Sequence, residues 1–152
     1  MNTKTTVIEK ARLEEQFGYC DKIAALWTQQ GRTPVAYVET YGCQQNEADS
    51  EKLRGYLSQS GYAIGKEAEG ADVVVMNTCS IREHAEQRVF GNLGALTHTK
   101  RRHPEQKIFL CGCMAGEPKV SERIKKSYPF VDGVFSTHHL WQFPEILYRV
   151  LT

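Results

Sequence analysis

The sequence predicts a doubly wound α/β domain, in which helices cover both faces of a mostly parallel sheet of four to five strands. Two observations predict it. Short apolar runs rich in β-branched and aromatic residues alternate along the chain with amphipathic segments of helical spacing. These runs are also continuous in their hydrophobicity, which is typical of parallel strands buried on both faces. The length of 152 residues suits a single domain.

A boundary is predicted near residues 31–34, where a polar, helix-prone segment gives way to the alternating pattern. We expect residues 1–33 to form an N-terminal helical extension and residues 34–152 to form the domain itself. Phe17 and Trp27 suggest that the extension packs on the domain, and a frayed N-terminus is the alternative.

Strands and helices then follow one another in a regular order. Strands are expected at residues 35–38, 71–75, 107–110 and 132–135, with a weaker one at 62–64. Asn46 is a candidate N-cap for the first helix between them, which should stop at Gly61. The capping box at residues 80–83 should begin the next helix. A shorter helix must end before Pro129, and residues 140–150 predict a last one. This order indicates a flavodoxin-like or Rossmann-like sheet.

Composition excludes several classes of protein. The chain carries 19 Lys and Arg against 18 Asp and Glu, a net charge of +1, which argues against nucleic-acid binding through bulk charge but leaves a local patch open. No run approaches the roughly twenty apolar residues of a membrane helix. The polar N-terminus carries both signs of charge and does not resemble an export signal. We therefore expect a cytoplasmic monomer whose cysteines are reduced.

Three of the five cysteines occupy equivalent places in the predicted fold. Cys43, Cys79 and Cys113 each lie between the carboxyl end of a strand and the start of a helix. In an open parallel sheet those ends share one edge, where ligands bind. Helix N-termini there favour anionic sulfur. Gly42 and Gly112, each directly before a cysteine, should let the backbone approach a bulky inorganic group. Ordinary buried cysteines are the alternative, and that interpretation suits Cys20 and Cys111.

The residue types narrow the choice of metal. Three thiolates without a fourth cysteine nearby fit poorly with a closed zinc site, unless one of four histidines completes it. Each of those histidines is by itself more often a solvated side chain; they are His84, His98, His138 and His139. Three cysteines that leave one iron open match a four-iron cluster used for chemistry. The pattern favours iron–sulfur and leaves zinc open.

Several ordered motifs resemble the N-terminal domain of the radical S-adenosylmethionine methylthiotransferases. The resemblance covers residues 35 to 150, and two of its motifs are most similar to the branch that acts on isopentenyl-adenosine beside the tRNA anticodon. These two are residues 42–46 and 79–83. The motifs are Tyr41-Gly42-Cys43-Gln44-Gln45-Asn46, Asp49-Ser50-Glu51, Asn77-Thr78-Cys79-Ser80-Ile81-Arg82-Glu83, Gly91-Asn92-Leu93-Gly94 and Gly112-Cys113-Met114-Ala115.

The resemblance implies that Cys43, Cys79 and Cys113 hold an auxiliary 4Fe-4S cluster whose open iron carries the sulfur that is methylated and transferred. It implies two partners, the anticodon loop of tRNA and a radical S-adenosylmethionine domain packed against the cluster edge. It assigns no catalytic residue in this chain. Two positions depart from the family pattern: Gly116 replaces a glutamine, and Cys111 is an extra thiol beside Cys113.

The larger departure is an absence. The sequence has no Cys-x-x-x-Cys-x-x-Cys triplet, so the second 4Fe-4S cluster and the S-adenosylmethionine site of the family are missing, as is its C-terminal RNA-binding barrel. We therefore expect the 152-residue chain to be inactive by itself, although the family consists of transferases.

Alternative functions remain open at this stage. One is a methylthiotransferase that acts on a ribosomal protein or on another tRNA base. Another is a non-catalytic zinc-binding or flavodoxin-like module, although no strand-to-helix turn carries a glycine-rich phosphate loop, and the nearest approach, residues 91–94, lies inside a predicted helix. The basic run at residues 100–103 either contacts RNA phosphates or is a solvated helix end.

Overall fold

The computed structural model of the chain describes residues 10–42, 44–78, 83–113, 115 and 117–152. Within them, five strands form one parallel sheet in the order β2-β1-β3-β4-β5. This order confirms the doubly wound α/β prediction and is the flavodoxin-like arrangement. The strands are β1 (Val35–Thr40), β2 (Ala63–Ile64), β3 (Val73–Thr78), β4 (Lys107–Gly112) and β5 (Gly133–Phe135).

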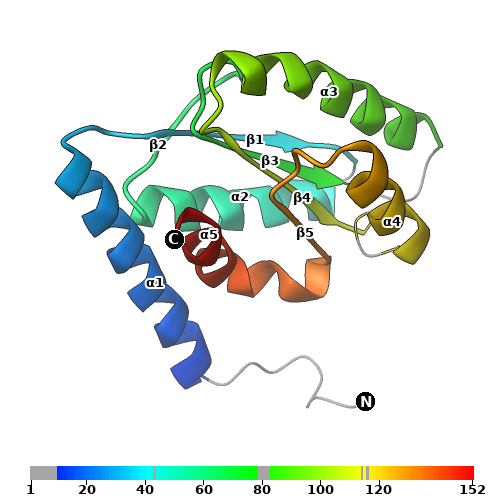
Figure 1. Cartoon of the computed structure of the whole chain (residues 1–152). Helices are drawn as coiled ribbons and strands as arrows, with labels where there is room; N and C mark the ends of the chain where they lie inside the picture. The colour runs from blue at the N-terminus through cyan, green and yellow to red at the C-terminus, as the bar shows by residue number, and fades with distance from the viewer. Residues whose placement is uncertain (1–9, 43, 79–82, 114, 116) are drawn as a thin grey trace, which may run out of the picture.

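Helices cover both faces of this sheet (Figure 1). The helices α1, α2 and α5, together with the 3₁₀ helix η3, pack against one face, and α3 and α4 pack against the other. Their bounds are α1 (Lys10–Gln30), α2 (Gln44–Gln59), α3 (Glu83–Arg102), α4 (Pro118–Ser127), η3 (Thr137–Gln142) and α5 (Phe143–Leu151). In the part of the chain that is described, none of these helices has the length and hydrophobicity of a membrane span.

The central strands explain the continuous apolar runs in the sequence. All six residues of β3 are buried, and successive side chains point to opposite faces of the sheet. Val73 and Val75 belong to the core under α1, α2 and α5, whereas Val74 and Met76 belong to the core under α3 and α4. Because both faces are covered, neither set of side chains is polar before the carboxyl end of the strand is reached.

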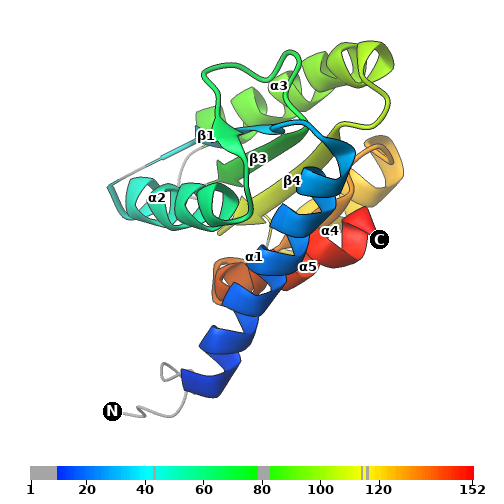
Figure 2. The same cartoon turned by 90° about the vertical axis from the view of Figure 1, so that its left-hand side faces the viewer.

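The N-terminal extension packs on the domain from residue 10 onward. Figure 2 shows α1 running alongside α5, and Ile23 on α1 is fully buried in the core that α5 also lines. The Gln16 amide joins the two helices, because its Nε2 donates to Glu145 Oε1 at 3.3 Å and its Oε1 accepts from the Glu145 amide at 3.1 Å. Trp27 packs against the same core as expected, but Phe17 is 46% exposed and does not.

At the amino edge of the sheet, the Asp72 carboxylate joins three segments. It accepts hydrogen bonds from both terminal nitrogens of Arg32 at 2.6 and 3.2 Å and from the Val35 amide at 2.8 Å. His103 Nε2 lies 3.5 Å away. Burial by itself would raise the pKa of this carboxyl group, but the Arg32 guanidinium and the Val35 amide outweigh burial and hold the pKa of Asp72 below its usual value.

The change Asp72→Asn keeps the shape of this side chain and removes its charge. We expect it to lower the free energy of unfolding by about 2 kcal/mol at pH 7. Because folding lowers the pKa of Asp72, its contribution is present above the pKa of the unfolded chain, about 4, and is lost as the pH falls through the folded value. Urea unfolding of both proteins between pH 7 and pH 3 measures this difference, which should shrink in acid. Glu69→Gln, at an exposed pair with Arg102, is the control and should change stability little.

Candidate functional site

The three strands that lead into the predicted cysteine ligands are neighbours in the sheet. β3 lies between β1 and β4, with Thr40 paired to Asn77 and Thr78 paired to Gly112. In the sequence, Cys79 follows β3 directly, Cys113 follows β4 directly, and Cys43 comes three residues after β1. The structure describes Cys113, whereas Cys43 and Cys79 lie outside the described residues. The topology therefore brings the segments that precede all three cysteines to one edge of the sheet.

The described cysteines differ sharply in accessibility. Cys113 is exposed, and its Sγ lies 3.9 Å from the hydroxyl of Thr137 at the start of η3. Cys111 is fully buried in the core, as expected, and burial together with the negative charge of Asp49 raises the pKa of its thiol. Burial likewise raises the pKa of Cys20. A buried thiol of raised pKa is a poor source of thiolate, so only Cys113 among these three suits a ligand at the edge.

The backbone conformation at residue 112 and the closeness of β3 both require a glycine there. Its φ is +99°, and a Cβ atom at this position would lie 2.2 Å from the carbonyl oxygen of Thr78. The expectation was that this glycine lets the backbone approach an inorganic group. The contact with the neighbouring strand is by itself a sufficient reason for glycine at position 112. Any larger residue would push β4 away from β3 just before Cys113.

A buried pair of asparagines ties β3 to the first turns of α2. Asn77 Nδ2 donates to the Asn46 carbonyl at 2.8 Å and to the Ser50 hydroxyl at 3.0 Å. In return, Asn46 Nδ2 donates to the Thr78 carbonyl at 2.8 Å. Asn46 was predicted to cap this helix, and that prediction was wrong, because α2 begins at Gln44 and the Asn46 side chain instead turns toward β3. These bonds hold the segment after Cys43 against the segment before Cys79.

The same polar network extends across the sheet to β4 and β1. Thr78 Oγ1 donates to the Cys111 carbonyl at 2.6 Å, and the hydroxyls of Thr40 and Ser50 lie 2.7 Å apart. Because the asparagines, Ser50 and Thr78 are all buried, each of these hydrogen bonds would be costly to break. The network explains why polar residues interrupt the apolar run of β3 only at its carboxyl end.

Tyr41 anchors the cysteine edge to α3. Its amide donates to the Asn77 carbonyl at 2.8 Å, and its buried hydroxyl accepts a hydrogen bond from Asn92 Nδ2. Burial raises the pKa of this hydroxyl, so it stays protonated at neutral pH. The Arg88 guanidinium lies 5.3 Å from the centre of the Tyr41 ring. Asn92 belongs to the motif at residues 91–94, and its contact with Tyr41 is a role that sequence reasoning missed.

The histidines do not assemble a metal site in the described part of the chain. His98, His138 and His139 are exposed, and His139 Nδ1 lies 3.0 Å from the Ser136 hydroxyl. The His84 side chain lies outside the described residues. Among the side chains that the structure describes, which leave out two of the three predicted cysteine ligands, no three His, Cys, Asp or Glu groups gather around one point.

The basic run at the end of α3 is mostly engaged within the chain. Lys100 Nζ donates to the Asp132 carboxylate at 2.9 Å and to the Phe130 carbonyl at 2.7 Å. Arg102 makes two bonds of 2.7 Å with Glu69. α3 also ends just before β4 begins, so this run lies at the amino edge, opposite Cys113 (Figure 1). Neither alternative for the run anticipated these pairs, which give Lys100 a structural role and engage Arg102 in an exposed ion pair.

Comparisons with known proteins place most of the chain in a recognised family. Residues 35–136 match the family described as Uncharacterized protein family UPF0004. A protein of Clostridioides difficile named tRNA-2-methylthio-N(6)-dimethylallyladenosine synthase is 40% identical over 148 residues, which are 95% of this chain and 31% of that protein. Proteins of the same name are 44% identical over 122 residues in Caldicellulosiruptor saccharolyticus (80% of this chain, 26% of that protein) and 49% over 113 residues in Clostridium tetani (74% and 25%). The chain thus spans between a quarter and a third of these relatives.

Gly112→Ala tests whether the backbone holds the end of β4 as described. Positive φ and the clash with Thr78 should lower the free energy of unfolding by at least about 3 kcal/mol. Gly94→Ala is the matched control, because a Cβ at this helical position meets nothing within 4 Å and should raise stability by up to about 1 kcal/mol. Chemical denaturation measures both. Equal stabilities for the two variants would contradict the description of Gly112.

Proposed function

The chain belongs to the Uncharacterized protein family UPF0004, and from the names of the similar proteins we propose that it is the cluster-binding, sulfur-donating domain of a tRNA methylthiotransferase. The reaction proposed is the addition of a methylthio group to isopentenyl-adenosine next to the anticodon. The names of the similar proteins support the substrate, since each is called a synthase of the methylthio derivative of dimethylallyladenosine in tRNA.

The proposed ligands of a 4Fe-4S cluster are Cys43, Cys79 and Cys113. The observation that carries the proposal is the order of the strands, because β1, β3 and β4 are adjacent and each is followed within three residues by one of these cysteines. The exposure of Cys113 fits a ligand at a shared edge. The burial of Cys20 and Cys111 argues against their taking part.

The chain's own residues hold the ligand-bearing segments in place. The Asn46–Asn77 pair binds the start of α2 to the end of β3, and Gly112 keeps the end of β4 against Thr78. Tyr41 fixes the segment before Cys43 to α3 through Asn92. When bound, a cluster with three cysteine ligands supplies an open iron that can carry a sulfur atom. Preorganised segments reduce the loss of conformational entropy when such a group binds.

Other parts of the reaction are assigned to residues outside this chain. The curated relatives are three to four times as long as the match, so S-adenosylmethionine and a second 4Fe-4S cluster would be bound by a radical domain that these 152 residues do not include. We propose that this radical domain packs against the cluster edge and that the anticodon loop of tRNA enters between them. The chain by itself should be inactive, monomeric and, like its tRNA substrate, cytoplasmic.

Anaerobic reconstitution with iron and sulfide tests the ligand set. The unaltered chain should take up about four irons and four sulfides and absorb broadly near the wavelengths typical of such clusters. Cys43→Ala, Cys79→Ala and Cys113→Ala should each lose most of this iron, because a cluster held by two thiolates is unstable. Iron and acid-labile sulfide analysis on samples of verified fold measures the result.

Cys20→Ala and Cys111→Ala are the matched controls, and both should retain the full iron content. Loss of iron in Cys111→Ala with full retention in Cys113→Ala would move the third ligand to Cys111. Stoichiometric zinc without sulfide in the purified chain would favour a structural zinc site instead.

A further inference from the structure

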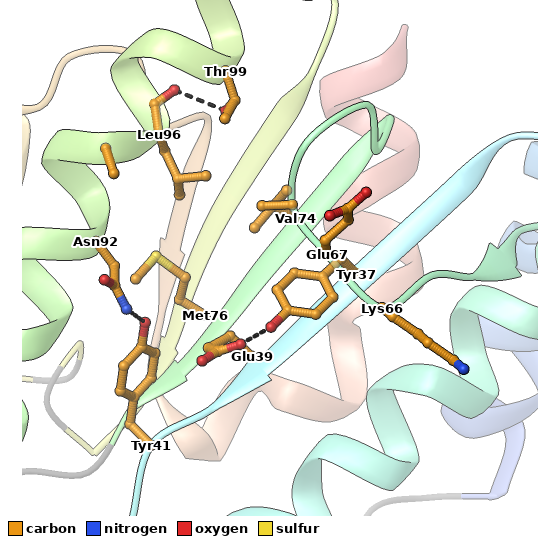
Figure 3. A pocket seen from close by; sticks show the side chains of 12 residues that line it. Tyr37, Glu39, Tyr41, Lys66, Glu67, Val74, Met76, Asn92, Leu96 and Thr99 are labelled. Carbon is orange, nitrogen blue, oxygen red and sulfur yellow. Dashed lines mark hydrogen bonds between the residues drawn. The ribbon is translucent and has the colours of Figure 1, made fainter.

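A groove of about 310 Å³ opens on the α3 side of the sheet, above β1. It exists because the connection from β2 to β3, residues 65–72, contains no helix, so above β1 only this loop covers the face that α3 and α4 cover elsewhere. Figure 3 shows Tyr37 and Glu39 on β1 facing the side chains of α3 across Val74 and Met76. The residues that line it are Tyr37, Glu39, Tyr41, Lys66, Glu67, Ala68, Val74, Met76, Asn92, Ala95, Leu96 and Thr99.

The groove begins at the candidate functional site. Tyr41 and Asn92, joined by their hydrogen bond, line its end nearest the carboxyl edge of the sheet. Tyr41 lies two residues before Cys43 in the sequence. A molecule held at the cysteine edge would therefore have a second place to bind on the same side of β1.

The polar groups of the groove are mainly acceptors. The Glu39 carboxylate accepts a hydrogen bond from the Tyr37 hydroxyl, and a carboxylate has room for further donors. Glu67 places a second carboxylate at the rim. Lys66 points its ammonium group away from Tyr41 and Asn92 (Figure 3). Beside Glu39, a ligand that brings N–H donors is therefore favoured over one that brings an anionic group.

The bottom of the groove and its end near Tyr41 indicate what kind of ligand fits. Val74, Met76 and Leu96 close the bottom of the groove and are almost fully buried. The apolar surface that a flat ring can contact comes mainly from Tyr37, Ala68 and Ala95 beside them.

The exposed Arg88 guanidinium lies over the Tyr41 ring, and no ion pair joins it to a carboxylate among the side chains that the structure describes, which leave out those of residues 81–86. An apolar slot with carboxylates inside it and the Arg88 cation beside Tyr41 matches a nucleotide of single-stranded RNA, whose base has N–H groups and whose phosphate is anionic. Lys66 is a second cation of the lining, on the side away from Tyr41. A peptide lysine would satisfy the carboxylates but would be repelled by Arg88.

We propose that this groove binds one unpaired RNA base with an exocyclic amino group, which donates to Glu39, while Arg88 contacts its phosphate. The inference rests on the proposed function, because the RNA would be the substrate whose modified adenosine lies at the cysteine edge. Uracil has no amino group, and its single N3–H donor lies between two carbonyl oxygens that the Glu39 carboxylate would repel, so we expect Glu39 to favour adenine or cytosine over uracil. The volume lies at the lower end of the range for small-ligand sites, which suits a single nucleoside.

Titration of the iron-free chain with RNA pentamers tests whether the groove binds an RNA base. Pentamers of adenylate or cytidylate should shift the methyl NMR signal of Met76, assigned with Met76→Leu, and should bind at least about tenfold more tightly than the uridylate pentamer. Glu39→Gln should remove most of that preference, because an amide both donates and accepts hydrogen bonds.

Arg88→Gln should weaken the binding of all pentamers alike and reduce the slope of log affinity against log salt concentration by about 0.7. Arg101→Gln, an exposed arginine at the other end of α3, is the matched control and should change neither.

Three outcomes would overturn the proposal: no binding at millimolar RNA, binding that leaves the Met76 signal unmoved, or a preference that Glu39→Gln does not alter. A Met76 signal that shifts with protein concentration in the absence of RNA would instead make the groove an interface between copies. Because the titration uses chain without iron, it can fail while reconstitution succeeds, and the reverse, so the two proposals are tested separately.

Discussion

The parallel pairing of β3 with β1 and β4 is the constraint on which the candidate site depends. Parallel register places the carboxyl ends of the three strands at one edge. The spacing of about 4.8 Å between hydrogen-bonded neighbouring strands sets how near the following segments can come. Burial on both faces specifies that register strongly. A shift of one residue would move Val74 and Val75 to the opposite faces of the sheet, each into the other's core. The segments leading to Cys43, Cys79 and Cys113 therefore take their positions from the core of the sheet.

Polar contacts then lock the two ends of β3. At the amino edge, the Asp72 carboxylate accepts hydrogen bonds from Arg32 and from the Val35 amide. At the carboxyl edge, the Asn77 side-chain amide donates hydrogen bonds to the first turns of α2. Each group is buried, so losing its partner would cost more than the net worth of an exposed bond. The two ends serve different purposes: the amino edge secures the connections between elements, and the carboxyl edge positions functional segments. The basic run at the end of α3 lies at the amino edge and helps to secure these connections.

Much of this organisation was predictable, and the exceptions have a common cause. The strand at residues 62–64, the helix that ends before Pro129 and the burial of Cys111 follow from local pattern and were confirmed. The role of Asn46 was not, because its side chain bonds to a carbonyl 32 residues away, whereas a cap bonds within its own turn. Lys100 likewise pairs with Asp132 across 32 residues. The ligand roles of Cys43, Cys79 and Cys113 and the boundary at residue 33 stay predictions.

Hydrophobic pattern and motif spacing alone establish the fold class, the family and the placement of three cysteines after three strands, because these properties are local in the chain. Only the tertiary structure decided which strands are neighbours, that Cys113 is exposed beside Thr137, and that a groove opens beside Tyr41. These features depend on contacts between segments far apart in sequence. Periodicity reports which side of an element is apolar, but it does not report which element covers that side.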